Sequence, residues 1–282
     1  MGTDNYYSVK EDVQKYIDGC KTKMNVRTHK VFGRAVLAGM MIAFGASASN
    51  VAAHAVTNVS LSRLVAGCVF PVGLMMVVLL GAELFTGDCL MAMGNAEGAC
   101  TIWDLIKFLF VVYVGNFVGS ILLAVVNVIS GQLNYSSGLL GAYTIKVAMG
   151  KVNMSFGQAL CSGILCNILV CAAVLMAMCA RDIVGKLFAC FFTIMLFVVA
   201  GYEHCIANMY YIPAGLIAAR NQNYVQVAMD TYGYTAEKLA SLNLYGFFVK
   251  NLVPVTIGNI IGGAVLGLIL LYLHGYDKKK AA

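Results

Sequence analysis

The sequence predicts an all-α integral membrane protein with six transmembrane helices, arranged as two inverted three-helix repeats whose second and fifth helices are interrupted. Composition, the lengths of the apolar segments and a set of echoed motifs lead to this prediction. Of the 282 residues, 60% are hydrophobic and 11% are charged, whereas an ordinary globular domain carries about 25% charged residues. The net charge of +6 does not indicate nucleic-acid binding, because the basic residues lie at the ends of apolar segments.

Residues 1–30 are polar and contain no apolar stretch that could serve as a cleavable signal peptide. They predict a cytoplasmic amphipathic segment instead. The run Ser8-Val-Lys-Glu11 fits a capping box, and one apolar stripe follows it, formed by Val9, Val13, Ile17 and Met24. Such a helix can lie along the membrane interface. It either anchors the terminus or has a gating role, and the sequence favours neither.

Six apolar segments follow, each near or above the roughly 20 residues that a spanning helix needs. The second and fifth are too long for simple spans, and their interiors contain Gly81-Ala-Glu83 and Gly201-Tyr-Glu203. Each is predicted to be two half-helices joined by a non-helical link, which is tolerated at membrane depth only when protein buries it or it lines a cavity. The six segments are expected at 31–56, 64–94, 105–129, 156–180, 187–219 and 248–273. The transmembrane domain is therefore placed at 31–273, and a basic tail at 274–282.

Three motifs recur in the same order in the two halves of the chain. Ala35-Val-Leu-Ala-Gly39 is echoed by Ala159-Leu-Cys-Ser-Gly163, and the two Gly-x-Glu motifs correspond to each other. Gly115-Asn-Phe-Val-Gly119 is echoed by Gly258-Asn-Ile-Ile-Gly262. Three spans per repeat is an odd number, so the second repeat enters the membrane from the opposite side, and the interrupted helices meet near the midplane.

The distribution of basic residues predicts the orientation of the chain. With six spans both termini lie on the same side, and that side collects thirteen of the nineteen Lys and Arg residues. Cytoplasmic loops carry such an excess. Both termini are therefore expected in the cytoplasm, in a multi-pass protein of the cytoplasmic membrane.

The candidate site lies in residues 200–208, Ala-Gly-Tyr-Glu-His-Cys-Ile-Ala-Asn. Ionisable residues within a membrane are costly and usually functional. The imidazole of His204 can hold or donate a proton near neutral pH, although a core histidine bonded to backbone is the alternative. The residues expected to shape the two breaks are Glu83, Glu203, Gly81, Gly87, Gly201 and Asn208.

Four stretches across residues 31–273 resemble the formate–nitrite transporter family. They are Gly81-Ala-Glu-Leu-Phe-Thr-Gly87, Cys166-Asn-Ile-Leu-Val-Cys171, Gly201-Tyr-Glu-His-Cys-Ile-Ala-Asn208 and Asn251-Leu-Val-Pro-Val-Thr-Ile-Gly-Asn259. The resemblance implies an aquaporin-like fold, a homopentamer in the lipid bilayer with one pore per protomer, and transport of a small monovalent anion. Formate, nitrite and hydrosulfide all remain open, and the bulky run from Tyr210 to Pro213 favours formate.

The resemblance also assigns expected roles along the substrate pathway. Thr86 resembles the threonine of a flexible loop that faces the central histidine. Lys151 resembles a vestibule lysine, which would raise the local concentration of anions. Asn167 either orients His204 or pairs with backbone at a break. The residues that resemble the family's apolar constrictions are Phe70, Leu74, Leu84, Val170 and Phe197. Lipid contact or core packing would explain such residues equally well.

A carboxylate lining an anion pathway would repel its substrate, so Glu83 and Glu203 are expected to pair with backbone donors at the breaks or to be protonated. Asp88 is expected to cap the second half-helix. The substrate crosses in one of two forms. It is either a neutral acid, after gaining a proton near His204 and Thr86, or an anion whose desolvation is offset by a protonated His204.

Other functional classes are less well supported. A channel needs no cofactor or metal, and the ten scattered cysteines show no metal-binding spacing. A membrane-embedded redox enzyme is the alternative from another class. Haem ligation would have to use His54 and His204, of which His54 lies near the end of a span. A proton-coupled transporter is the alternative to a passive channel.

Overall fold

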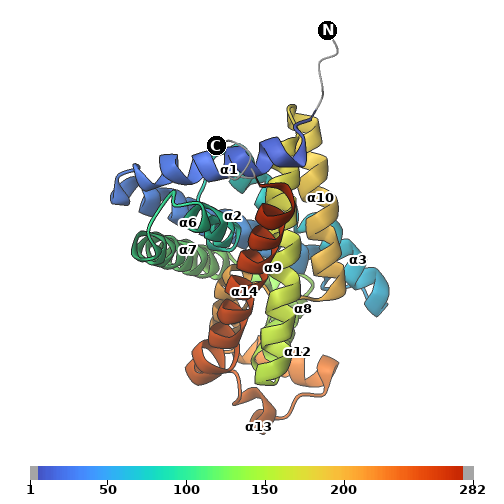
Figure 1. The fold of residues 1–282 in the computed structure, drawn as a ribbon. Coiled ribbons are helices and arrows are strands. Elements are labelled where there is room, and N and C mark those ends of the chain that lie inside the picture. Colours follow the sequence, from blue (N-terminus) through green and yellow to red (C-terminus); the bar gives the residue numbers. More distant parts are fainter. Residues whose placement is uncertain (1–5, 276–282) are drawn as a thin grey trace, which may run out of the picture.

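A computed structural model describes residues 6–275 of the chain (Figure 1). Most of the predicted 274–282 tail lies outside the described residues. Within them the chain is helical, and its one extended pairing is the isolated bridge between Tyr6 and Ala180. The elements are α1 (Val9–Met24), α2 (Thr28–Ala53), α3 (Val59–Val69), α4 (Val72–Leu79), α5 (Phe85–Asp88), η1 (Cys89–Met91), α6 (Ala92–Ala96), α7 (Ile102–Ile129), η2 (Gln132–Asn134), α8 (Leu139–Val152), α9 (Phe156–Cys179), α10 (Ile183–Ala200), α11 (Cys205–Ala218), α12 (Gln222–Tyr232), α13 (Ala236–Leu239), η3 (Gly246–Leu252) and α14 (Val253–His274).

Six helical segments of the described chain are long and apolar enough to cross a membrane. They are α2, α3 together with α4, α7, α9, α10, and η3 together with α14. The predicted second segment is divided between α3–α4 and the short helices α5, η1 and α6. The predicted fifth segment is divided between α10 and α11. The prediction that these two helices are interrupted is therefore confirmed.

Small residues allow the outer helices of each repeat to pack closely. A Cβ atom added to Gly119 of α7 would collide with the carbonyl oxygen of Val36 on α2, and one added to Gly258 of α14 would collide with that of Leu160 on α9. Small residues at such contacts let helix backbones approach one another within a membrane. The echoed Gly-Asn-x-x-Gly motifs thus form equivalent helix–helix contacts in the two repeats.

Two helices were not expected from the sequence. α8 and α12 are too short to span a membrane and lie between predicted segments, at the end of the molecule opposite α1 (Figure 1). α8 packs against α11, where a Cβ on Gly215 would collide with Ala148. α8 therefore ends beside the second interrupted helix and places Lys151, in its last turn, next to the break.

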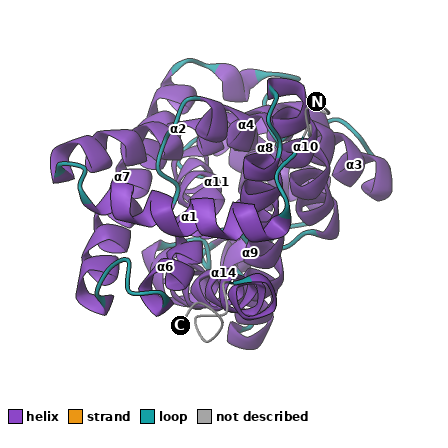
Figure 2. Ribbon diagram, turned by 45° about the horizontal axis from the view of Figure 1, so that its top comes forward, coloured by secondary structure: helices purple, strands orange, loops and turns teal. Residues whose placement is uncertain are grey.

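The predicted amphipathic helix is present as α1, which begins with a complete Ser8–Glu11 capping box. It lies across the end of the helix bundle near α6 and α9 (Figures 1 and 2). Val13 and Ile17 of the predicted stripe are buried, whereas Val9 is exposed. The apolar face of α1 is thus covered by the transmembrane helices of the same chain.

Candidate functional site

The two breaks are built in the same way. Gly81 and Gly201 have φ values of +64° and +77°, a left-handed conformation that glycine adopts without steric cost and that commonly ends helices. Three residues of extended or irregular chain follow each glycine, and the second half-helices begin at Phe85 and Cys205. The link leaves backbone groups of both half-helix ends without helical partners.

Two asparagines supply those partners. Asn116 of α7 accepts the Phe85 N–H at 2.9 Å and donates to the carbonyl of Glu83 at 2.9 Å. Asn259 of α14 accepts the Cys205 N–H at 2.9 Å and donates to the carbonyl of Glu203 at 3.0 Å. Sequence reasoning assigned no role to either residue. The signal was available, because the same Asn stands inside both copies of the Gly-Asn-x-x-Gly motif.

His204 and Thr86 face each other where the two breaks meet. Their Nε2 and Oγ1 atoms are 2.9 Å apart, and the two side chains are 3% and 0% exposed. His204 is also the N-cap of α11, because its Nδ1 accepts the N–H of Ala207 at 3.1 Å. With Nδ1 acting as an acceptor, the proton of the neutral ring is on Nε2, and Nε2–H donates to Thr86 Oγ1.

Asn167 holds the backbone of the first break. Its Nδ2 donates to the carbonyls of Thr86 at 3.1 Å and of Asn259 at 2.5 Å. The Thr86 carbonyl also accepts from the Cys171 thiol at 3.3 Å. Of the two roles left open for Asn167, the structure therefore shows pairing with backbone at a break, and it shows no bond from Asn167 to the ring of His204.

The carboxylate of Glu203 has side-chain partners instead of the expected backbone donors. Lys151 Nζ lies 2.8 Å from Oε1. Asn208 and Asn251 donate to Oε2 at 2.7 and 3.2 Å. The expectation of backbone pairing or protonation is wrong, because a buried lysine and two amides solvate the charge. Lys151, which resembles a vestibule lysine, has a side chain that is 14% exposed and paired with this carboxylate.

The first break has its own lysine. Lys23 of α1 lies 2.6 Å from Glu83 and 2.5 Å from Asp88, and Arg34 lies 3.7 Å from Glu83. Burial opposes the charge of Lys23, but the carboxylates of Asp88 and Glu83 outweigh burial and raise the pKa of Lys23 above its usual value. Asp88 makes no helix cap. The expected cap is wrong because its carboxylate binds Lys23. Glu83 likewise pairs with basic side chains.

The middle of α1 also contacts the first break, because the hydroxyl of Tyr16 donates to the carbonyl of Gly87 at 3.1 Å. Gly87 was expected to shape the break. Its carbonyl is here the acceptor that ties α1 to α5. Sequence reasoning missed Tyr16 and Lys23 because their partners at this break are 60 or more positions away in the chain.

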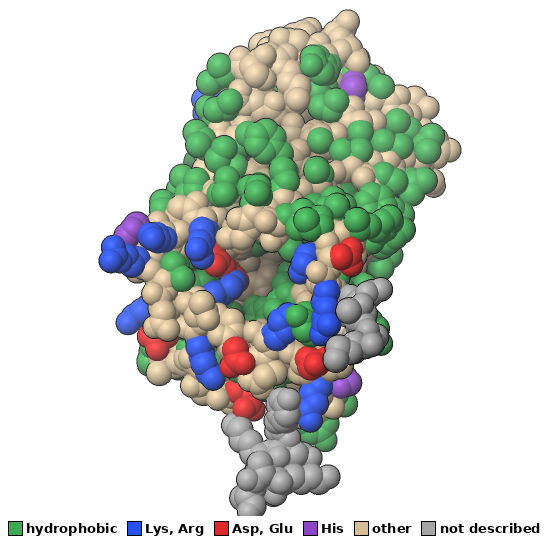
Figure 3. All heavy atoms as spheres, turned by 90° about the horizontal axis from the view of Figure 1, so that it is seen from above, with side chains coloured by type: hydrophobic (Ala, Val, Ile, Leu, Met, Phe, Trp, Pro, Cys, Tyr) green, Lys and Arg blue, Asp and Glu red, His purple; other side chains and the backbone are tan. Residues whose placement is uncertain are grey.

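Two cavities lead toward the Thr86–His204 pair from opposite ends of the molecule. The proximal cavity, on the α1 side, has a volume of about 350 Å³ and is lined by Tyr16, Lys23, Arg34, Leu74, Glu83, Leu84 and Asp88 among others. The distal cavity has a volume of about 520 Å³ and is lined by Asn50, Arg63, Phe70, Lys146, Lys151, Phe197 and His204 among others. Figure 3, seen from the α1 side, shows a hollow with acidic and basic side chains around it.

The expected constriction residues are divided between these cavities. Leu74 and Leu84 line the proximal cavity, whereas Phe70 and Phe197 line the distal one. The Phe197 ring centroid lies 5.5 Å from that of Phe70 and 6.0 Å from that of His204. Val170 is 1% exposed and lines neither cavity. Apolar side chains therefore flank the Thr86–His204 pair on both sides.

A family model described as "Formate/nitrite transporter" matches residues 10–273. The chain belongs to the formate/nitrite transporter family. It is 40% identical over 257 residues to the formate channel FocA of Haemophilus influenzae, covering 89% of each chain. It is 37% identical over 221 residues to the formate channel FocA of Escherichia coli K12, covering 77% of this chain and 76% of that protein.

Among solved structures, one described as a pentameric formate channel with formate bound matches with a TM-score of 0.80 and 33% identity, covering 87% of this chain and 96% of that one. This match, together with the family model, places the interrupted helices and the six spans in the fold of a formate/nitrite transporter. The family is one of membrane channels and transporters, so the multi-pass architecture and the anion-channel class follow from membership.

His54, which haem ligation in the redox alternative would have to use, is instead hydrogen-bonded within the protein. His54 ends α2, and its ring nitrogens lie 2.7 Å from the Val51 carbonyl and 2.8 Å from the Ser136 hydroxyl. Within residues 6–275 no group of three or more His, Cys, Asp or Glu side chains is arranged to hold a metal ion.

Proposed function

We propose that the chain is a channel for the small monovalent anions of weak acids across the cytoplasmic membrane, with formate as its substrate. The names of the FocA relatives support formate. The observation that carries the proposal is the Thr86–His204 pair, enclosed between two cavities and flanked by Leu84 and Phe197. The basic residues on the α1 side support a cytoplasmic position for both termini.

The pair is suited to offer a hydrogen bond to one small oxygen-bearing solute. His204 Nε2–H donates to Thr86 Oγ1, because Nδ1 is engaged by Ala207. The hydroxyl hydrogen of Thr86 then remains available to donate to the substrate. Because this hydroxyl is itself an acceptor of a hydrogen bond, its donor strength is increased through cooperativity.

The surroundings favour passage of the substrate as a neutral acid. An apolar constriction bars a hydrated ion, since nothing there compensates its dehydration. A second proton on His204 would have to enter at Nδ1 and would break the bond to Ala207. His204 acts here as a hydrogen-bond donor, and the proton of the neutral acid comes from solvent in the cavities. The flux therefore depends on pH.

A flux assay in proteoliposomes tests the substrate. Formate, nitrite and hydrosulfide are compared at about pH 5.5 and 7.5, on either side of the usual histidine pKa. We expect the highest rate for formate and a rise at the lower pH. A higher rate for nitrite or hydrosulfide would replace formate as the substrate, and no flux of any of them would contradict the channel. Accumulation against a gradient, driven by pH alone, would show proton coupling instead of passive passage.

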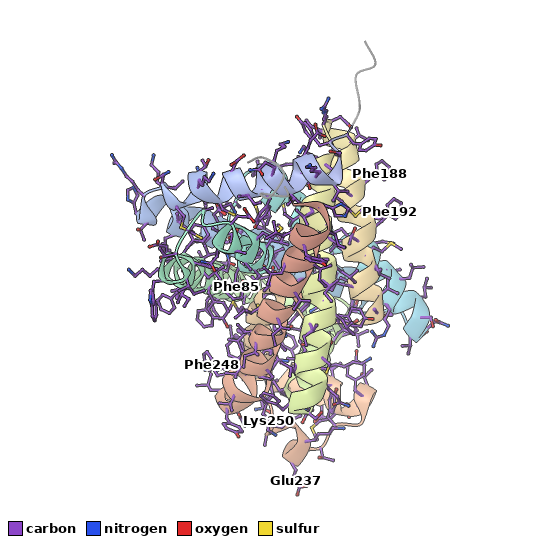
Figure 4. The ribbon with its side chains drawn as sticks, viewed as in Figure 1. Phe85, Phe188, Phe192, Glu237, Phe248 and Lys250 are labelled. Carbon is purple, nitrogen blue, oxygen red and sulfur yellow. The ribbon has the colours of Figure 1, made fainter. Side chains whose placement is uncertain are left out.

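We also propose that the chain assembles as a homopentamer with a pore in each protomer. The pentameric title of the matching structure supports this. The outer face is apolar, and Phe188 and Phe192 project from α10 away from the bundle, each more than half exposed (Figure 4). Such side chains suit a lipid or protomer contact. Native mass spectrometry should give a mass of five chains, and a monomer would contradict the assembly.

The chain is proposed to have three parts. Residues 1–30 form a cytoplasmic segment whose α1 covers the proximal cavity, and residues 31–273 form the channel domain. Residues 274–282 form a basic cytoplasmic tail. The contacts of Tyr16 and Lys23 with the first break support a gating role for α1 over simple anchoring.

A further inference from the structure

A further hollow lies on the outer surface of the protein, between two of its spans. α7 packs closely on α2 and α14 packs closely on α9, whereas α7 and α14 do not pack closely on each other. The space between them is a groove with a volume of about 630 Å³. Its lining residues run from Ile106 to Phe117 on α7 and from Phe248 to Ile260 on η3 and α14. This hollow is called the α7–α14 groove below.

The middle of the groove is formed by equivalent positions of the two repeats. Tyr113 and Thr256 each stand three positions before the asparagine that holds a break, Asn116 or Asn259. Their hydroxyl oxygens are 2.9 Å apart. The two hydroxyls therefore satisfy each other where the repeats meet.

The rest of the groove is apolar. Apart from Tyr113 and Thr256, every lining side chain is aliphatic or a phenylalanine. Tyr113 lies about 17 Å along α7 from its first residue, Ile102, which is near the middle of a hydrocarbon core about 30 Å thick. Water finds no unpaired polar partner there, and a cavity of this kind stays dry and takes up apolar molecules.

The dimensions of the groove decide between a hydrocarbon chain and a helix of a second copy. The lining of α7, from Ile106 to Phe117, rises about 17 Å. About 630 Å³ spread over that length leaves a mean cross-section of roughly 40 Å². An α-helix with its side chains is at least about 10 Å across, or about 80 Å². A helix is too thick to lie in the groove, whereas an unbranched chain of methylene groups is not.

The inner wall of the groove reaches the first break. Phe85, the first residue of α5, lines the groove, and its ring centroid lies 4.8 Å from that of Tyr113. Phe85 and Phe248 lie on the same side of α14 (Figure 4). Thr86 is the next residue in the chain. A molecule in the groove therefore supports the backbone that carries Thr86.

The same wall reaches the second break. The side chain of Thr256 forms a hydrogen bond with that of Cys205, the first residue of α11. His204 directly precedes Cys205. The groove is thus one residue away from each partner of the Thr86–His204 pair, although neither partner lines it.

We propose that the α7–α14 groove binds one acyl chain of a bilayer phospholipid, and that this chain supports the two half-helices that bear Thr86 and His204. The binding site is independent of the transported substrate, whereas the effect on flux rests on the proposed function. A straight chain restores the dispersion contacts that the walls of an empty groove lack. A chain with methyl branches is thicker and fills the groove less completely.

Photolabelling in proteoliposomes tests the occupant. The probe is a phosphatidylcholine with a diazirine near the end of one chain, and labelled residues are located by mass spectrometry. Ile257→Trp places an indole in the groove. Ile261→Trp is the matched control, because the two isoleucines lie one turn apart on α14 and are 42% and 39% exposed, but only Ile257 lines the groove.

We expect label on Tyr113 and Phe110 in the wild type and in Ile261→Trp, and its loss in Ile257→Trp. Label on the exposed face of α10 should be the same in all three proteins and serves as the internal standard. Unlabelled groove residues in the wild type, which a second copy seated over the groove would produce, would overturn the inference. Equal labelling of Tyr113 in the two tryptophan variants would also overturn it.

Formate flux tests the support of the half-helices. Flux is compared in bilayers of straight-chain and of methyl-branched phosphatidylcholine. The wild type and Ile261→Trp should each be about threefold slower in the branched lipid. Ile257→Trp should show the same flux in both lipids, because the indole fills the groove. Equal lipid dependence of the two variants would overturn the support of the half-helices.

A second pair of variants guards against misfolding. Val114→Trp fills the groove from α7, and Val118→Trp, one turn further along, does not line it. Monodisperse elution and an unchanged melting temperature establish that a variant is folded. This pair should reproduce the contrast between the Ile257 and Ile261 variants, and identical behaviour of the two valine variants would contradict the inference.

The photolabel also separates this inference from the proposed function, because labelling requires no transport. Saturable label in the groove of a protein that transports none of the three anions would support the acyl-chain site and overturn the channel. Formate transport without label in the groove would support the channel and overturn the acyl-chain site.

Discussion

Replacement of Asn259 by Leu should destabilise the protein and reduce its flux together. The Asn259 side chain makes three hydrogen bonds, accepting from Cys205 N–H and donating to the carbonyls of Gly163 and Glu203. It is 0% exposed. Leu has a similar size and fills the space, but it leaves three buried backbone groups without partners and releases the end of α11 that bears His204.

The size of the effect follows from these contacts. Hydrogen bonds between membrane helices contribute about 0.6 kcal/mol each, which puts the lower bound for three lost bonds at about 2 kcal/mol. Each orphaned buried group can cost about 1–3 kcal/mol, which puts the upper bound for three groups at about 9 kcal/mol. At roughly 2–4 °C per kcal/mol for a large domain, the melting temperature should fall by at least about 4 °C.

The assay is thermal denaturation in detergent, combined with formate flux in proteoliposomes. Asn153→Leu is a suitable control, because that asparagine is exposed and bonds within its own helix end and to Ser241. Asn116→Leu should resemble Asn259→Leu, since the two side chains make equivalent bonds at the two breaks. An Asn259→Leu protein that melts with wild type and conducts normally would refute this account of the breaks.

Three further predictions concern single contacts. Lys151→Met should lower the melting temperature markedly by leaving the charge of Glu203 buried and unpaired, and adding Glu203→Gln should restore most of it; equal melting of both variants would count against the pair. Burial raises the pKa of Asp12, so the docked α1 favours the protonated carboxyl; this contribution is full below the unfolded pKa of about 3.9 and is lost as pH rises through the higher folded value. Hydrogen exchange of α1, corrected for intrinsic rates, should therefore slow on acidification, and Asp12→Asn should remove that dependence. Gly119→Ala should destabilise by forcing apart two helix backbones, whereas Gly157→Ala, which meets open space, should not; equal melting temperatures would contradict the close packing.

The features that the sequence predicted best are those that depend only on the residues of one continuous segment. Apolar length and the Gly81 and Gly201 motifs predicted the interrupted helices, because glycine at a left-handed position is a local requirement. The family resemblance led to the Thr86–His204 contact, whose two atoms are 2.9 Å apart. Residue chemistry alone would not have identified Thr86 as a site residue.

The partners of the carboxylates could not be predicted because they depend on packing between distant segments. Glu83 is reached by Lys23 from α1, and Glu203 by Lys151 from a helix too short to look like a span. From the sequence, both carboxylates were expected to pair with backbone donors at the breaks or to be protonated. The ion pairs offset the charges of lysines that line the two cavities.

The central claim, that the substrate passes the Thr86–His204 pair by accepting a hydrogen bond from Thr86, is tested most directly by comparing Thr86→Val with Thr86→Ser. Valine keeps the shape of threonine and removes the hydroxyl, whereas serine keeps the hydroxyl. A hydrogen bond between neutral groups contributes about 0.5–1.5 kcal/mol, and each 1.36 kcal/mol of barrier changes a rate about tenfold. The account predicts formate flux reduced about two- to tenfold in the folded valine variant and near wild type in the serine variant. Equal flux through the two variants would contradict it.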